Sequence, residues 1–266
     1  MSGPVASVNP SVTPRTFKKI HSELSTIFNY YDTNAARSST VKISQKLRNQ
    51  KIAIIGLGGT GSYVLDFVAK TPVSEVHLFD GDEYLLHNSF RSPGAPSINE
   101  FDNTKAKVKY HYDIYNRMHK GIIPHNEHVQ PENIALLDGM SFVFLCIDKG
   151  SAKKAIVEYL IEHGIPFIDT GIGVQKVDDT LVGAIRVTTV TPMMNSHVGR
   201  RIQMVDDDND AYSSNIQIAE LNALNAALAV IKWKKLLGFY LDAVETNHSV
   251  YTIDTGLVSK KEDKKV

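Results

Sequence analysis

A cluster of glycines between two short apolar runs constrains the fold of this chain more strongly than any other feature. The first run, Lys51–Ile55, is apolar and β-branched, which is typical of a buried strand. A second run, Glu75–Asp80, is typical of another strand and ends on an acid. Between them, a segment with helical spacing follows a turn that contains Gly56, Gly58, Gly59 and Gly61. This order predicts a nucleotide-binding unit, because glycines let phosphate approach the backbone and a helix N-terminus supplies free N–H donors.

The residues after this unit bear on which nucleotide binds. An acid such as Asp80, about 20 residues beyond the glycines, is what an NAD site requires for its ribose hydroxyls. Arg91 and Lys105, however, would bring two cations close to the phosphate-binding turn. Two cations suit the triphosphate of ATP, because they neutralise charge that develops during phosphoryl or nucleotidyl transfer. The sequence therefore favours ATP, with an NAD(P)-dependent oxidoreductase as the alternative.

Separated motifs along the chain resemble the ThiF/MoeB/HesA family and the adenylation domains of ubiquitin-activating enzymes. They are GLGGTG at 56–61, DGD at 80–82, HNSFR at 87–91, NTKAK at 103–107 and LCIDK at 145–149. The similarity extends from about residue 45 to about residue 257. It implies an α/β fold with a Rossmann-like, mostly parallel sheet, helices on both faces and antiparallel additions at the C-terminal edge. It also implies ATP-dependent transfer of an adenylyl group.

The resemblance assigns roles to individual residues. It implies a nucleotide site that contains Gly56, Gly58, Gly59, Gly61, Asp80, Asp82, Asn88, Arg91, Lys105 and Asp148. Asp80 would hold the ribose, and Arg91 and Lys105 would steady the transferring and leaving groups. Asp148 would bind the Mg²⁺ that accompanies ATP, since this cation prefers carboxylate, phosphate and water oxygens. Lys149 stands where relatives commonly carry an asparagine, so a hydrogen bond from that position is not expected.

The reaction that the resemblance implies is attack of a carboxylate on the α-phosphorus of ATP, with release of pyrophosphate. The implied substrate is the C-terminal glycine of a ubiquitin-like or sulfur-carrier protein. A conjugating enzyme is a further candidate partner, and the expected assembly is a homodimer. A catalytically inactive scaffold subunit of an activating complex is another alternative, although the intact series of charged residues speaks against it.

The composition limits the other function classes. The chain has 266 residues, 42% of them hydrophobic, which suits one large α/β domain. Lys+Arg and Asp+Glu number 29 each, so a nucleic-acid-binding surface is not expected. No apolar run approaches the ~18 residues of a membrane span, so we expect a soluble protein with no membrane partner. The single cysteine excludes an internal disulfide and fits a reducing, cytoplasmic compartment.

That cysteine, Cys146, invites comparison with the ubiquitin-activating enzymes, in which a cysteine accepts the acyl group as a thioester. It lies in an apolar run, Met140–Ile147, and no neighbouring histidine or basic cluster would lower its pKa. We therefore expect core packing rather than catalysis. One cysteine also makes a four-thiolate zinc site impossible, so no structural zinc is expected.

The predicted domain organisation has three parts. Residues 1–44 form an arm and a helix over 15–31, residues 45–258 form the adenylation domain, and residues 259–266 form a charged tail. Gly171 and Gly173 predict a bend, and Gly238 the end of a helix. The remaining predicted elements are helices over 104–118, 151–163 and 216–237, strands over 140–147, 166–169 and 250–254, and a crossover loop over 193–215.

Overall fold

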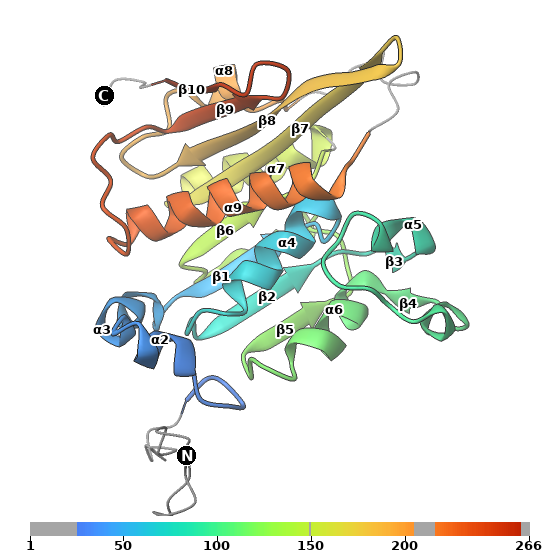
Figure 1. Ribbon diagram of the computed structural model, residues 1–266. Coiled ribbons are helices and arrows are strands. Elements are labelled where there is room, and N and C mark those ends of the chain that lie inside the picture. The colour runs from blue at the N-terminus through green and yellow to red at the C-terminus, as the bar shows by residue number, and fades with distance from the viewer. Residues whose placement is uncertain (1–25, 149, 205–215, 262–266) are drawn as a thin grey trace, which may run out of the picture.

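A large sheet with helices packed on both faces forms the body of the protein (Figure 1). The structure is a computed structural model that describes residues 26–148, 150–204 and 216–261. Its 8-stranded sheet has the order β10-β9-β8-β7-β6-β1-β2-β5, and β3 and β4 form a separate 2-stranded sheet. The strands are β1 Lys51–Ile55, β2 Glu75–Phe79, β3 Glu83–Tyr84, β4 Lys105–Ala106, β5 Ile122–His125, β6 Phe142–Leu145, β7 Phe167–Val177, β8 Thr180–Val190, β9 His248–Thr252 and β10 Val258–Lys261.

The strands from β7 to β5 in this order run parallel to their neighbours. Ile55 in β1 lies opposite Phe79 in β2 and Leu145 in β6, so these three strands end at the same level. The chain leaves β1 towards one face of the sheet and leaves β6 towards the other. Open α/β sheets bind ligands where the crossovers diverge in this way, at the carboxyl ends of the strands. The topology confirms the predicted α/β class and points to the edge beside β1 and β6.

The other half of the sheet is antiparallel. β7 continues well beyond the predicted strand over 166–169 and forms a long hairpin with β8. The bend predicted at Gly171 and Gly173 is wrong, because both glycines pair with β8 inside this hairpin. β9 confirms the antiparallel strand predicted over 250–254, with bounds two residues earlier. β10 was not predicted, and it contains residues that the sequence assigned to the charged tail.

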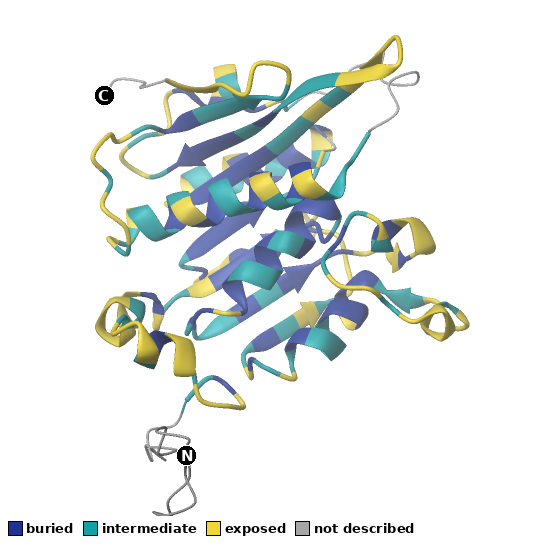
Figure 2. Ribbon diagram, in the orientation of Figure 1, coloured by how far each residue is buried: buried dark blue, intermediate teal, exposed yellow. Residues whose placement is uncertain are grey.

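Helices cover the two faces of the sheet (Figures 1 and 2). α4 (Gly59–Val68), α6 (Lys107–Tyr115) and α9 (Ala219–Leu236) share one apolar core, and α7 (Gly150–Glu162) packs on the other face. The positive φ of Gly238, 67°, follows α9 as expected for a helix end. The short helices are α2 Thr33–Arg37, α3 Val41–Ser44, α5 Leu86–Ser89 and α8 Val198–Arg201, with 3₁₀ turns at Gln45–Leu47, Ile98–Phe101 and Ile134–Leu137.

A buried ion pair joins α7 to the sheet. Nζ of Lys153 lies 2.8 Å from Oδ1 of Asp169, and the two side chains are 3% and 0% exposed. Nη2 of Arg186 in β8 lies 3.5 Å from the other carboxylate oxygen. Burial raises the pKa of the Asp169 carboxyl, and the two cations oppose that rise. The cluster therefore depends on its cations to compensate a carboxylate that no water reaches.

The predicted helix over 15–31 is wrong for the part that the structure describes. Residues 26–31 are not helical, and Phe28 instead forms an isolated bridge with His119. The earlier residues of that prediction, residues 205–215 of the predicted crossover loop and residues 262–266 of the predicted tail lie outside the described residues. Across the described ranges, no helix combines the length and the apolar character that crossing a membrane requires.

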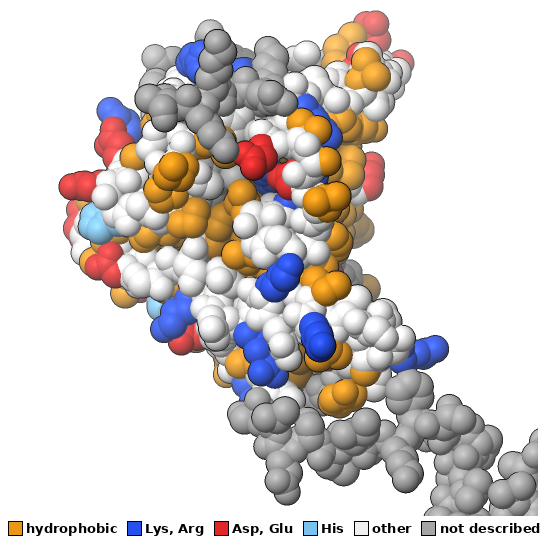
Figure 3. Space-filling view, turned by 90° about the vertical axis from the view of Figure 1, so that its left-hand side faces the viewer, with side chains coloured by type: hydrophobic (Ala, Val, Ile, Leu, Met, Phe, Trp, Pro, Cys, Tyr) orange, Lys and Arg blue, Asp and Glu red, His pale blue; other side chains and the backbone are white. Residues whose placement is uncertain are grey.

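The side of the molecule at the left of Figure 1 lies at the amino ends of the parallel strands. Its hydrophobic side chains form separate groups with lysine and arginine between them (Figure 3). A shallow pocket of about 450 Å³ is lined there by the segments that precede β6 and β7, residues 138–141 and 163–166. Its lining includes Asp138 and contains no lysine or arginine, so it does not suit a nucleotide phosphate.

Candidate nucleotide site

The glycine turn between β1 and α4 is shaped by contacts that exclude side chains. Gly56 has a φ of 88°, a conformation that other residues rarely adopt. A Cβ added to Gly61 would lie 1.8 Å from the carbonyl oxygen of Gly56, and one added to Gly59 would lie 2.1 Å from Nδ2 of Asn222. A Cβ on Gly58, by contrast, would meet no described atom within 4 Å. Three glycines are thus required by the protein's own packing, and Gly58 leaves open space beside the start of α4.

Asp80 fixes this turn to the end of β2. Its side chain is buried, and its Oδ2 accepts a hydrogen bond from the main-chain N–H of Leu57 at 2.7 Å. Its Oδ1 accepts from the N–H of Asp82 at 2.9 Å. Lys107, which the sequence analysis missed, places Nζ 2.6 Å from Oδ2 of Asp82 and 3.6 Å from Oδ1 of Asp80. Asp80 therefore lies beside the glycine turn, as predicted, and also holds it in shape.

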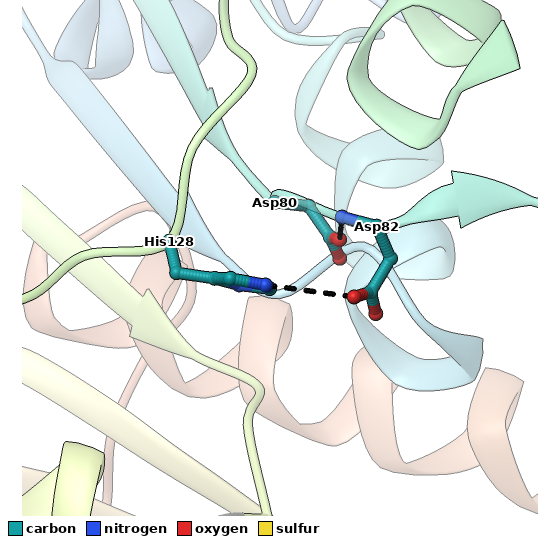
Figure 4. Close-up of side chains that lie close together, drawn as sticks. All are labelled: Asp80, Asp82 and His128. Atoms are coloured by element: carbon teal, nitrogen blue, oxygen red, sulfur yellow. Dashed lines mark hydrogen bonds and ion pairs between the residues drawn. The ribbon is translucent and has the colours of Figure 1, made fainter.

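Asp80, Asp82 and His128 bring three potential metal ligands together (Figure 4). One ligand atom from each lies within 4.8 Å of the others, and Nε2 of His128 is 3.5 Å from Oδ1 of Asp82. The ammonium group of Lys107 already contacts both carboxylates. A metal ion here would have to displace the ammonium group of Lys107 or bind against its positive charge. The cluster is therefore better explained as an ion-pair network.

A long segment after β2, residues 81–106, carries the predicted residues Asn88 and Arg91; we call it the excursion. Asn88 is buried, and its Oδ1 accepts a hydrogen bond from the N–H of Leu85 at 2.8 Å. Ser92 donates through Oγ to the carbonyl oxygen of Asn88 at 2.6 Å and lies 3.0 Å from the hydroxyl of Tyr84. These contacts fix the segment, yet Nδ2 of Asn88 and Nε of Arg91 are buried and have no described hydrogen-bond partner.

The position of Lys105 is fixed by the pairing of β4 with β3. It lies opposite Tyr84, and the N–H of Lys107 donates to the carbonyl oxygen of Asp82 at 2.9 Å. The prediction of Lys105 in the first turn of a helix is wrong, because α6 begins at Lys107. Lys105 is partly buried and has no hydrogen-bond or ion-pair partner within the ranges that the structure describes. A half-buried ammonium without an acceptor is the environment expected for a group that binds an anion.

Asp148 follows β6 at the same edge. A Cβ on Gly56 would lie 2.7 Å from the carbonyl oxygen of Cys146, so the segment after β6 packs directly against the glycine turn. Asp148 is exposed there, two residues beyond Cys146. An accessible carboxylate beside the glycine turn is compatible with Mg²⁺, which takes few protein ligands and completes its shell with phosphate oxygens and water.

Cys146 lies just after β6 and packs against the core, as expected. It is partly buried, and the loss of solvation raises the pKa of its thiol to about 12. The hydrogen bond with Thr170 opposes that rise and is outweighed. At neutral pH the group is therefore a protonated thiol, which is a poor nucleophile.

His111, one turn after Lys107 in α6, is a buried histidine that should make stability depend on pH. It is 1% exposed, and neither ring nitrogen has a described hydrogen-bond partner. Burial, together with the charge of Lys107, lowers its pKa from 6.5 to about 3. The folded state thus binds fewer protons than the unfolded state between these values, and stability is lost as the pH falls through this window.

We expect His111→Phe to remove this acid sensitivity. Urea unfolding at pH 7 and pH 4 should show that the variant loses about 2–3 kcal/mol less stability than the wild type over this interval. The exposed residue His163 provides the control, because His163→Phe should leave the difference unchanged. Identical pH dependence in the wild type and His111→Phe would show that folding does not lower the pKa of His111.

The described residues form a Rossmann-like α/β protein with a glycine turn at the carboxyl edge of its parallel strands. The chain belongs to the ThiF family, whose sequence pattern matches residues 31–253. This finding confirms the resemblance that the separated motifs indicated.

Two curated relatives illustrate the similarity. The chain is 27% identical over 149 residues to the tRNA threonylcarbamoyladenosine dehydratase of Escherichia coli (strain K12), covering 55% of each chain. It is 25% identical over 149 residues to ubiquitin-like modifier-activating enzyme 5 of Rattus norvegicus, covering 51% of this chain and 36% of that one. The matches thus span only part of each relative's length.

Solved structures share the fold. A crystal structure of E. coli MccB with ATP has a TM-score of 0.65 at 17% identity, covering 83% of this chain and 65% of that one. A crystal structure of PaaA has a TM-score of 0.65 at 17% identity and covers 98% of this chain and 80% of that one. At this level of identity the likeness concerns the fold, and it confirms the predicted sheet architecture.

Proposed function

We propose that this protein is an ATP-dependent adenylyltransferase that activates a carboxylate. The observation that carries the proposal is a set of donors on the excursion that have no acceptor among the described residues: Nδ2 of Asn88, Nε of Arg91 and the ammonium group of Lys105. Buried donors are normally satisfied, so a cationic group and an amide without described acceptors on one segment favour an anionic ligand there. The triphosphate of ATP supplies such a ligand at the glycine turn. Membership of the ThiF family and a structural neighbour crystallised with ATP support this choice.

In the proposed reaction, a carboxylate oxygen attacks the α-phosphorus of ATP, the bond to the β-phosphate breaks, and pyrophosphate leaves. The turn from Gly56 to Gly61 would hold phosphates with backbone N–H groups, and Asp80 the ribose. Arg91 and Lys105 would offset the charge that builds up on the transferring and leaving groups. Asp148 would hold Mg²⁺, which supplies further charge neutralisation to the bound triphosphate. Catalysis would then rest on positioning and electrostatics, because the substrate brings its own nucleophile.

The proposed acyl substrate is the C-terminal glycine of a ubiquitin-like or sulfur-carrier protein. One relative is named a ubiquitin-like modifier-activating enzyme, which favours a protein substrate, whereas another is named a tRNA dehydratase. The equal numbers of acidic and basic residues favour the protein substrate over a nucleic acid. The product adenylate would pass to an acceptor such as a conjugating enzyme.

A homodimer is the proposed assembly. The outer side of α9 exposes Leu224 at 36% and Ile231 at 42%, and the neighbouring α4 adds the half-buried Tyr63 and Phe67. Apolar side chains in adjacent positions on two packed helices are suited to contact with a second copy of the chain.

Nucleotide titration tests the proposal against its main alternative. We expect Mg·ATP to bind with micromolar to millimolar affinity and NADH not to bind, because two cations without a described partner suit a triphosphate better than a nicotinamide. Isothermal titration of both nucleotides measures this directly. NADH binding without ATP binding would reverse the assignment in favour of an oxidoreductase. ATP binding without pyrophosphate exchange, tested with ubiquitin-like proteins and with tRNA, would instead favour an inactive scaffold.

A further inference from the structure

A buried asparagine at the start of α9 links the two segments that the proposed reaction requires. Asn222 is 0% exposed, and its Oδ1 accepts a hydrogen bond from Oγ1 of Thr60 at 3.1 Å. Its Nδ2 lies 3.5 Å from the main-chain carbonyl oxygen of Arg91. One amide therefore contacts the first turn of α4 on one side and the backbone of the excursion on the other.

The fit of this side chain against α4 is tight. A Cβ on Gly59 would lie 2.1 to 2.6 Å from the terminal atoms of Asn222. Only glycine at position 59 therefore leaves room for this side chain of α9. The amide cannot move towards Gly59 without a clash. Its position relative to the glycine turn is thus set by packing, independently of any ligand.

Among the described residues, few hydrogen bonds fix the position of Arg91 relative to that turn. Its N–H donates to the carbonyl oxygen of Asn88 at 3.1 Å, a contact within the excursion itself. Nε has no partner in the described part of the chain. The other described hydrogen bonds of residues 88–92 also stay within the excursion. The contact with Asn222 is therefore the described hydrogen bond that ties this segment to the body of the domain.

We propose that Asn222 is a positioning residue. It holds the main chain of Arg91 in place relative to the glycine turn. This inference rests on the proposed ATP-binding function and adds to it a residue that does not touch the nucleotide. The distance of 3.5 Å is long for a hydrogen bond, and it is expected to shorten when ATP draws Arg91 inwards. Asn222 then limits how far the excursion moves and with it the orientation of the guanidinium group.

The same helix offers a matched control. Asn225 lies one turn further along α9, is also 0% exposed, and donates through Nδ2 to the carbonyl oxygen of Gly171 at 3.1 Å. It ties α9 to β7 and has no described hydrogen bond to the excursion. Asn222→Ala and Asn225→Ala remove the same group from equally buried positions, so a general loss of packing should affect both alike.

A double-mutant cycle on Mg·ATP affinity separates positioning from packing. We expect Asn222→Ala to weaken binding about five- to tenfold, as for the loss of one or two hydrogen bonds. In an Arg91→Ala background the same change should weaken binding less than about twofold, because the residue it positions is gone. Asn225→Ala should change affinity less than about twofold in either background. Isothermal titration of the full chain measures all of these affinities.

Two outcomes would overturn the inference. Equal effects of Asn222→Ala in the presence and absence of Arg91 would show that Asn222 acts through packing alone. Failure of the wild type to bind Mg·ATP would remove the proposed function as well, and this result is distinguishable because it appears before any substitution. Asn222→Ser provides a smaller change at the same position if the alanine variant does not fold.

Discussion

Replacement of Lys105 by alanine is expected to lower the rate of ATP–pyrophosphate exchange by about 100-fold or more. Lys105 is partly buried, has no described partner, and is held by the pairing of β4 with β3 rather than by a flexible loop. In the proposed reaction its charge offsets the negative charge that grows as pyrophosphate leaves. Removing one preorganised donor of this kind typically costs about 10²–10³ in rate. Arg91→Ala should have an effect of the same order for the same reason.

Lys109 provides the matched control for Lys105. It lies on α6, its side chain is 57% exposed, and it is paired with Asp113 one turn away. Lys109→Ala should leave exchange within about twofold of the wild type, since an exposed pair contributes little. Exchange is measured at saturating ATP with the carboxylate substrate that supports it in the wild type. Wild-type exchange in Lys105→Ala would exclude Lys105 from the reaction, whatever the fate of the other residues.

The sequence predicts those parts of the site whose positions depend on residues close to one another in the chain. The glycine turn and Asp80 directly follow the apolar strands β1 and β2, and Asp148 comes three residues after the end of β6. A buried parallel strand has a strong local pattern, and its carboxyl end fixes where the next side chains lie. Arg91 was predicted through its motif, and the structure places its segment beside the glycine turn through Asn222.

Lys105 was assigned to the wrong element because its position depends on a distant partner. β3 and β4 have two residues each, and about 20 residues separate them in the sequence. Strands this short carry no periodic pattern, so the sequence alone extends the helical spacing of α6 to Lys105. Tyr84 pairs with Lys105 between the two strands. A contact between residues this far apart cannot be recognised from a short stretch of sequence.

Buried polar residues were missed for a related reason. Asn222 and Thr60 are 162 positions apart, and Lys153 and Asp169 lie on different elements. The sequence does carry a signal for the first pair, because two asparagines at a spacing of three interrupt the apolar run over residues 221–231. Polar side chains on a buried helix face need partners, so this spacing predicts a contact with a loop or a strand end. The identity of the partner still depends on how α9 crosses the sheet.

The cluster of Lys153, Asp169 and Arg186 shows what such a non-local contact contributes to stability. Asp169 is fully buried at the level where the parallel strands end, and β7 continues from it into the long hairpin with β8. Lys153 reaches it from the second turn of α7. The start of α7 and the hairpin are thus joined through one carboxylate. Because α7 begins two residues after Asp148, this link also steadies the segment that carries the proposed metal ligand.

Lys153→Met is therefore expected to lower the free energy of unfolding by about 3–5 kcal/mol, because it leaves a buried carboxylate with Arg186 alone. Lys154→Met is the matched control: its side chain is 58% exposed and lies 3.9 Å from Glu158, so about 0.5 kcal/mol or less should be lost. Adding Asp169→Asn to Lys153→Met should recover part of the loss, since the uncompensated charge is gone. Equal stability of the two lysine variants in urea unfolding would mean that Arg186 compensates Asp169 by itself and that α7 is held by its apolar face.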